Sequence, residues 1–139
     1  MKRLRFLALC LASLVTPFFL AVLLAHAAGA EETFPQKLVR AARSQVGVTT
    51  QYVPDYVKLD YPMGDLPIER GVCTDVVIRA LRVCGHDLQE LVHLDMKQNF
   101  SAYPKNWGLK STDRNIDHRR VPNLMTYFTR KGMKQPTSD

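Results

Sequence analysis

The sequence has little cysteine and no repetition. Its 139 residues include 3 cysteines and a single tryptophan, and they show no internal repeat, no low-complexity segment and no linker rich in glycine or proline. We therefore expect one domain. The three histidines that follow residue 30 stand at no metal-ligand spacing to one another or to the cysteines. The sequence accordingly predicts no metal and no cofactor.

One long apolar run is present, at residues 6–24, behind three basic residues at the N-terminus. The small residues at 28–30 fit the cleavage pattern of a secretory signal. We therefore expect a signal peptide over residues 1–30, and a mature chain over 31–139 that resides in the periplasm without stable membrane contact. An inner-membrane anchor formed by residues 6–24 is the alternative, because about 20 apolar residues can span a bilayer.

The net positive charge is smaller in the mature chain than in the full sequence, which includes the leader, the expected signal peptide. Formal net charge falls from +6 to +3, with 16 Lys and Arg against 13 Asp and Glu, because the leader holds three basic residues and no acidic one. A mildly basic surface is compatible with anionic cell-wall polymers or lipid head groups. It gives no reason to expect binding to nucleic acid.

Capping residues and the spacing of apolar side chains predict four helices in the mature chain. They are expected from Thr33 to Gly47, over 73–84, from Asp87 to Gln98, and from Pro122 to Gly132. Residues 48–70 are dense in Tyr, Pro, Gly and Asp, which predicts a loop with one short extended piece over 56–61. Such a loop forms either a wall of a cleft or a surface segment whose tyrosines pack on the helices.

Cys73 is the candidate nucleophile. It stands in the expected first turn of a helix, where unpaired N–H groups and the helix dipole favour the thiolate. At about 100° per residue, Cys73 shares a face with Val76 and Ala80, so the thiol is expected to point to the interior or into a cleft. Asp75 and Arg79 fall on the opposite side. The alternative reading of Cys73 is a small buried apolar residue, as most unpaired cysteines are.

Export would place Cys73 and Cys84 in an oxidising compartment, where thiols pair if geometry allows. On one unbroken helix, eleven residues at ~1.5 Å each separate the two by ~16 Å, against a Cα limit of ~7 Å for a disulfide. We therefore expect no bond between them. A catalytic role explains a free thiol at Cys73, core packing explains Cys84, and pairing between molecules stays open.

A cysteine nucleophile needs a base, normally an imidazole within hydrogen-bond reach. His86 and His93 are expected in surface or capping roles, away from Cys73. His118 stands in an irregular polar stretch with Asp117 beside it. It is either the base or, as we prefer, a structural or ligand-contacting residue.

Several ungapped blocks of this sequence resemble the bacterial domain-of-unknown-function 1287 family. They are Tyr61-Pro62-Met63-Gly64-Asp65, Gly71-Val72-Cys73-Thr74-Asp75-Val76-Val77-Ile78-Arg79-Ala80, Asp87-Leu88-Gln89, Asp95-Met96 and Ile116-Asp117-His118-Arg119-Arg120-Val121-Pro122-Asn123-Leu124. The resemblance covers roughly residues 35–132. That family in turn resembles the NlpC-like cell-wall peptidases of the papain-like group, in which a cysteine at a helix start attacks a peptide amide of peptidoglycan.

The resemblance implies an α+β, papain-like cysteine hydrolase domain with Cys73 as the catalytic nucleophile. We take Tyr61, Asp75, His118 and Arg119, which stand in the matching blocks, as substrate-binding candidates. Such domains continue past the last helix into a small antiparallel sheet that carries the catalytic histidine. No such histidine or strand pattern follows Gly132, so we expect residues 31–139 to be mainly the helical N-terminal portion of the domain, without the catalytic sheet and with impaired or no activity.

Two functions stay open at this point. One is an exported thiol hydrolase, an amidase or endopeptidase acting on peptide bonds of peptidoglycan. The other is a non-catalytic periplasmic module that binds an anionic cell-wall glycan or lipid. The module would use aromatic and basic side chains, namely Tyr52, Tyr56, Tyr61, Trp107, Arg114, Arg119 and Arg120. For the arginines, the alternative is a solvated loop with local salt bridges.

Overall fold

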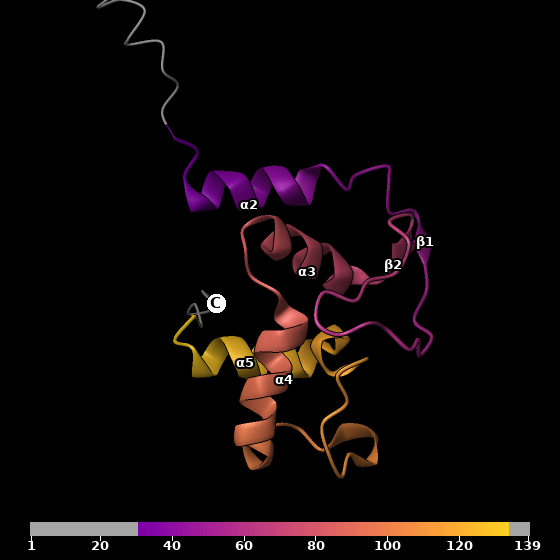
Figure 1. Ribbon diagram of the computed structural model, residues 1–139, viewed down its shortest axis with the longest axis vertical. Coiled ribbons are helices and arrows are strands. Elements are labelled where there is room, and N and C mark those ends of the chain that lie inside the picture. The colour runs from indigo at the N-terminus through magenta and orange to yellow at the C-terminus, as the bar shows by residue number, and fades with distance from the viewer. Residues whose placement is uncertain (1–30, 134–139) are drawn as a thin grey trace, which may run out of the picture. The chain divides into compact units, whose positions relative to one another are not determined.

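The computed structural model describes residues 31–133, and one compact unit begins at Thr33. Its helices are α2 (Phe34–Arg43), α3 (Cys73–Val83), α4 (Leu88–Gln98) and α5 (Val121–Arg130), its strands β1 (Gln51–Tyr52) and β2 (Arg70–Gly71), and its 3-10 helices η1 (Phe100–Ala102), η2 (Asn106–Gly108) and η3 (Asp117–Arg119). In this unit α2 packs on α3, and α4 packs across α5 (Figure 1). Helices with one small sheet make the fold α+β.

The helices begin where the capping residues predict. At the start of α2 the Thr33 N–H donates to the side chain of Gln36 at 2.9 Å, and at the start of α4 the Asp87 carboxylate accepts the N–H of Gln89 at 3.2 Å. Each bond satisfies a donor that the helix itself leaves unpaired. The first helix ends at Arg43, earlier than expected, and turns carry the chain on to residue 48.

The core lies where α3, α4 and α5 meet. Its buried members are Ile78, Leu88, Val92, Leu124 and Tyr127. Burying an aliphatic side chain of this size contributes about 1.5–3 kcal/mol, so these three helices hold one another. Not every apolar residue of α5 contributes to this core, because Met125 is 65% exposed.

A long irregular segment, residues 53–69, connects the two strands. Residues 56–61 form no strand, contrary to expectation. The extended pieces lie instead at the two ends of the segment, where β1 and β2 pair in parallel with Gln51 opposite Arg70 and Tyr52 opposite Gly71. The short parallel pair thus closes a loop of 17 residues beside the N-terminus of α3.

Side chains of the helices, rather than a sheet, form hydrogen bonds with the backbone N–H and C=O groups of this loop. The Gln89 amide of α4 accepts the N–H of Gly64 at 2.9 Å and donates to the carbonyls of Asp60 at 2.8 Å and Arg114 at 3.2 Å. Gln89 is 1% exposed. A buried amide that pairs with three backbone groups fixes the loop, because leaving any of them unpaired would be costly.

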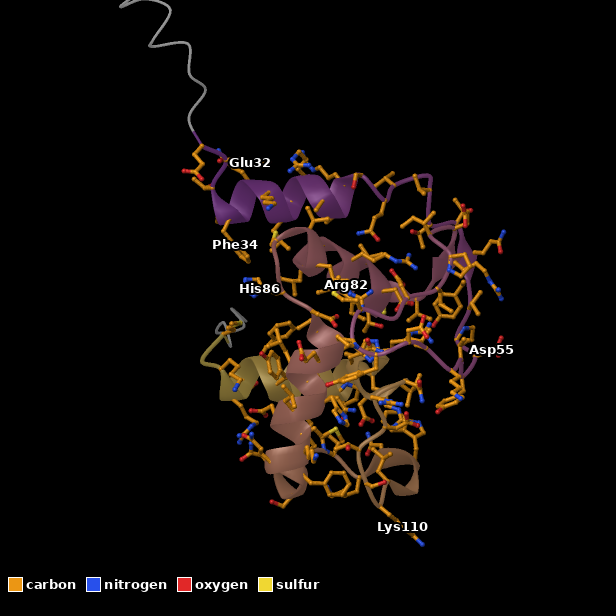
Figure 2. All side chains as sticks on the ribbon, in the orientation of Figure 1. Glu32, Phe34, Asp55, Arg82, His86 and Lys110 are labelled. Carbon is orange, nitrogen blue, oxygen red and sulfur yellow. The ribbon has the colours of Figure 1, made fainter. Side chains whose placement is uncertain are left out.

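The charged residues Asp75 and Arg79 of α3 are buried, contrary to the expectation that they lie on the side of the helix away from the interior. Arg79 forms a two-pronged ion pair with Asp65, with Nε–Oδ2 and Nη2–Oδ1 both at 2.9 Å. Arg82, labelled in Figure 2, donates from Nε to Asp87 at 2.9 Å and from Nη2 to the Gly64 carbonyl at 2.9 Å. For these residues the helical-wheel prediction is wrong because it takes a charged side chain to be exposed to solvent, whereas these charges are paired inside the fold.

His86 follows α3 at the surface, as predicted. Its ring is exposed and packs edge-on against Phe34 of α2, with 5.7 Å between ring centroids (Figure 2). Across residues 31–133, no helix is both long enough and apolar enough to traverse a bilayer. The signal or anchor predicted over residues 1–30 lies outside the described part of the chain.

Candidate functional site

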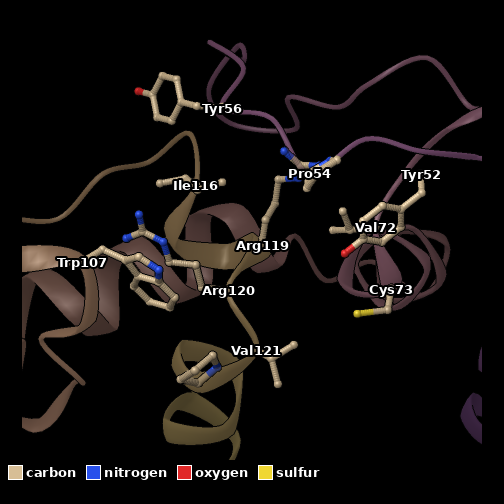
Figure 3. Close-up of a pocket in the computed structure, with 11 residues that line it drawn as sticks. Tyr52, Pro54, Tyr56, Val72, Cys73, Trp107, Ile116, Arg119, Arg120 and Val121 are labelled. Carbon is tan, nitrogen blue, oxygen red and sulfur yellow. The ribbon is translucent and has the colours of Figure 1, made fainter.

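A cleft of about 480 Å³ opens beside the N-termini of α3 and α5 (Figure 3). It is lined by Tyr52, Pro54, Tyr56, Val72, Cys73, Trp107, Ile116, Arg119, Arg120, Val121 and Pro122. These residues come from β1, the loop after it, the start of α3, and the segment from η2 to α5. Segments far apart in the sequence therefore build one site.

Cys73 is the first residue of α3 and stands at one end of the cleft (Figure 3). Its side chain is exposed, so the prediction of a cleft position is confirmed and that of an interior position is wrong. The first-turn N–H groups of a helix have no partner within that helix. An accessible thiol beside such donors has the placement that nucleophilic cysteines require.

Asp75 fixes the turn that presents Cys73. Its Oδ2 accepts the N–H of Val72, the residue that precedes α3, at 2.7 Å. The hydroxyl of Thr74 donates to the Arg119 carbonyl at 2.9 Å, which ties this turn to η3. Both side chains are buried, so contacts within the protein interior hold the start of the helix.

Arg119 is the buried partner of Asp75. Its Nε donates to Asp75 Oδ1 and its Nη2 to Asp75 Oδ2, each at 3.0 Å. The same guanidinium donates to the carbonyls of Val53 at 3.1 Å and Asp55 at 3.3 Å. Arg119 therefore joins three segments of the cleft wall, and its donors are used within the protein.

Gly71 allows this packing. A Cβ at this position would lie 3.0 Å from Asp75 Oδ2 and 3.1 Å from Asp75 Cβ. Contacts this close are tighter than most real Cβ contacts, so any side chain here would push Asp75 away. Glycine at the end of β2 thus lets the strand approach the helix start.

Trp107 and Arg120 stand at the end of the cleft away from Cys73 (Figure 3). The Arg120 guanidinium carbon lies 4.4 Å from the centroid of the Trp107 ring, within cation–π range. Trp107 is 60% exposed and has a positive φ of 66°, a left-handed conformation that is uncommon for residues other than glycine. Such an outlier on an exposed aromatic residue is a feature that clusters at functional sites.

Asp117 lies behind Arg120. It is 1% exposed, accepts the N–H of Asp113, and is 3.4 Å from Arg120 Nη1. Burial raises the pKa of Asp117, against the N–H of Asp113 and the charge of Arg120, which lower it. The ion pair holds Arg120 through Nη1, and among residues 31–133 the other two guanidinium nitrogens have no hydrogen-bond partner.

His118 lies in the protein interior and does not line the cleft. Its ring is 2% exposed and its Nδ1 has no hydrogen-bond partner among the described residues. Burial, assisted by the charge of Arg82, lowers the pKa of His118 to about 4. The structural role preferred from the sequence agrees with this placement, whereas direct contact with a ligand in the cleft does not.

Tyr61 lies outside the cleft as well. Its ring packs edge-on against His93, with 5.4 Å between centroids, and the guanidinium of Arg114 lies 5.4 Å from its centroid. Burial raises the pKa of Tyr61, and burial lowers that of His93. These three side chains form a separate group on the surface of α4 and its neighbouring loop.

Of the predicted site residues, the cleft brings together Cys73 and Arg119. Asp75 supports them from beneath, while Tyr61 and His118 lie elsewhere. The residues that the catalytic and substrate-binding predictions missed are the aromatic and apolar walls. Among them, Tyr52, Tyr56, Trp107 and Arg120 had been grouped only as candidates for a binding module.

Within residues 31–133, Cys73 and Cys84 form no disulfide with each other, as predicted. Cys84 follows the last turn of α3 and is half-buried. Between residues 31 and 133, no group of three or more His, Cys, Asp or Glu side chains is arranged to hold a metal ion.

The chain matches the family model described as a domain of unknown function (DUF1287) over residues 39–139. It is also 62% identical over 97 residues to "Uncharacterized protein YijF" of Escherichia coli (strain K12). That match covers 70% of this chain and 47% of the relative, so the chain spans about half the length of this curated relative. No solved structure matches the chain. The extent of the family match shows that this protein belongs to the DUF1287 family.

Proposed function

We propose that this protein is an exported thiol hydrolase that cleaves an amide bond in the peptides of peptidoglycan, with Cys73 as the nucleophile. The observation that carries the proposal is the exposed Cys73 thiol, on the first turn of α3, at one end of a cleft of about 480 Å³. The resemblance of the family to NlpC-like, papain-fold peptidases and the signal predicted over residues 1–30 supply the substrate class and the periplasmic location.

In the proposed reaction the Cys73 sulfur attacks the carbonyl carbon of the amide. A carbon–sulfur bond forms, the carbon–nitrogen bond breaks, and the proton lost by the thiol ends on the departing amine. Water then attacks the thioester, which releases a carboxylic acid and restores the thiol. The N–H groups at the start of α3, including that of Cys73, are suited to stabilise the oxyanion.

The position of Cys73 in the cleft supports its proposed role as nucleophile, and the histidines of the described chain offer no base there. His118 is buried, and of the histidines between residues 31 and 133 none lines the cleft. Arg119 and Asp75 act as positioning residues, because their buried pair holds the turn that bears Cys73.

The test is the release of soluble muropeptides from purified peptidoglycan sacculi by the protein recovered from the cell envelope, followed by mass spectrometry. Wild-type protein should release them, and Cys73→Ala should lower the rate by on the order of 10³-fold. Cys84→Ala is the matched control, since this half-buried cysteine lies at the other end of the helix, and it should cut normally. Undiminished cutting by Cys73→Ala, or no cutting by the wild type, would refute the proposal.

A second candidate is a module that binds an anionic glycan or lipid without cleaving it. It is favoured by the aromatic side chains of Tyr52, Tyr56 and Trp107 around a cleft that also contains Arg120. This candidate predicts sedimentation of the protein with sacculi that is unchanged in Cys73→Ala and weakened in Arg120→Gln. Loss of sedimentation in Cys73→Ala alone would count against it.

A further inference from the structure

The cleft has a charged end and a thiol end. Figure 3 shows Cys73 and Tyr52 at one end and Trp107 with Arg120 at the other, with Val121 between them. A ligand that places a reacting carbonyl at Cys73 must therefore extend along the cleft to reach the guanidinium. The two ends are separate subsites of one groove.

The two arginines of the cleft differ in what they can still bind. Arg119 donates to both oxygens of Asp75 and to two backbone carbonyls, so it is occupied. Among residues 31–133, the Arg120 guanidinium donates one hydrogen bond, from Nη1 to Asp117 at 3.4 Å. Within the described part of the chain its Nε and Nη2 have no protein partner, and a guanidinium edge of this kind matches the two oxygens of a carboxylate.

The surroundings of Arg120 favour an anion over a cation. No aspartate or glutamate from residues 31–133 lines the cleft, and Asp117 is enclosed behind Arg120. The Trp107 ring packs against the guanidinium and shields it from water on one side. Partial desolvation strengthens a charge-assisted hydrogen bond to an incoming ligand.

We propose that Arg120, held against Trp107, is a carboxylate-binding subsite that selects peptides with an acidic side chain distant from the bond that Cys73 attacks. This inference rests on the proposed hydrolase function in one respect, namely that the ligand is a peptide. The subsite itself binds without chemistry at Cys73, so the two proposals fail independently.

The experiment uses the tryptophan emission of the full chain. Because Trp107 is the single tryptophan, its fluorescence reports directly on occupancy of this end of the cleft. The Cys73→Ala variant, which cannot react, is titrated with acetyl-Ala-Glu-Ala-Ala-amide and with the same peptide carrying Gln in place of Glu. We expect a saturable change with both and about tenfold tighter binding of the Glu peptide, the discrimination of one charge-assisted contact.

Two further variants, made in the same background, assign the effect. Arg120→Gln should bind the two peptides equally, at the affinity of the Gln peptide. Arg114→Gln is the matched control, because Arg114 also packs on an aromatic ring but lies outside the cleft, and it should keep the tenfold preference. Preserved discrimination in Arg120→Gln, or its loss in Arg114→Gln, would overturn the assignment.

A third titration distinguishes a peptide carboxylate from a sugar carboxylate as the ligand of Arg120. Glucuronic acid carries the same group on a sugar ring, and tighter binding of this sugar than of the Glu peptide would overturn the choice of a peptide ligand. Equal affinity for the Glu and Gln peptides, or no saturable change in Trp107 emission with either, would contradict the subsite as a whole. None of these results depends on whether the protein cleaves peptidoglycan.

Discussion

Asp75 and Arg119 form a buried two-pronged ion pair, with both nitrogen–oxygen distances at 3.0 Å, directly beneath the turn that presents Cys73. The pair links α3 to η3, and through the carbonyls of Val53 and Asp55 it also links the loop that follows β1. The shape of the cleft therefore depends on a buried contact between Arg119, which lines the cleft, and Asp75, which does not.

Removing one charge of this pair should destabilise the protein strongly. We expect Asp75→Asn to lower the free energy of unfolding by about 3–5 kcal/mol, because the Arg119 guanidinium is left buried without its counter-charge. Urea unfolding followed by circular dichroism measures this. Arg114→Gln, an exposed arginine, is the control and should change the stability by less than about 0.5 kcal/mol. A loss below 1 kcal/mol for Asp75→Asn would contradict the role of the pair.

Arg79 should not be replaceable by lysine. The Arg79→Lys variant loses the two-pronged contact with Asp65 and several hydrogen bonds to carbonyls of residues 66–70, since an ammonium cannot reproduce the fork. We expect a loss of about 2 kcal/mol, with faster amide hydrogen exchange in residues 64–71. The exposed Arg43 gives the matched control, Arg43→Lys. Unaltered exchange in the loop would show that Arg79 does not hold it.

Asp95 should make part of the stability depend on pH. Its carboxylate accepts hydrogen bonds from Arg130 Nε at 2.8 Å, the Tyr103 hydroxyl at 2.7 Å and Lys131 Nζ at 3.0 Å. Burial raises the pKa of Asp95, but these hydrogen bonds outweigh it and lower the pKa from 3.8 to about 2. The folded protein therefore favours the ionised carboxylate, by about 2 kcal/mol.

This contribution is complete above the unfolded pKa of 3.8 and is lost as the pH falls towards 2. The difference in unfolding free energy between wild type and Asp95→Asn should thus be largest above about pH 5 and shrink towards pH 2. Chemical denaturation at a series of pH values measures it. A difference that stays constant over this range would show that the charge of Asp95 is not what stabilises the fold.

His118 should stay neutral in the folded protein well below pH 6.5. Burial lowers its pKa to about 4, so its contribution to stability is present above 6.5 and is lost as the pH falls through the interval between 6.5 and 4. The imidazole signals of His118 in an NMR titration should move with a midpoint near 4. A midpoint near 6.5 would place the ring in contact with solvent and contradict its burial.

The helices were predictable from the sequence because their signals are local. Thr33, Asp87 and Pro122 mark helix starts through interactions within one turn, and the structure begins its helices beside them. The orientation of α3 was not predictable in this way. Its buried charges are paired with Asp65, Asp87 and Arg119, two of which lie far along the chain, so a helical wheel cannot show them.

The sequence predicted the position of Cys73 in the candidate site, but not which residues form the walls of the cleft around it. A cysteine in a helix start is visible in a short stretch of sequence, whereas the approach of Tyr52, Trp107 and Arg120 depends on how the loops close. The loops are held in place by hydrogen bonds from Arg79, Gln89 and Arg119. The partners of these side chains are mostly backbone carbonyls. Carbonyl groups are common to every residue, so no sequence pattern reveals which of them will be used.

The most direct test of the account is selective alkylation of Cys73. The envelope-derived protein is treated with limiting iodoacetamide near neutral pH. Modification of Cys73 and Cys84 is mapped by mass spectrometry, and release of muropeptides from sacculi is measured in the same samples. We predict that Cys73 reacts first and that cutting falls in proportion to its modification while Cys84 is still free. Full activity in protein whose Cys73 is completely alkylated would contradict the central claim.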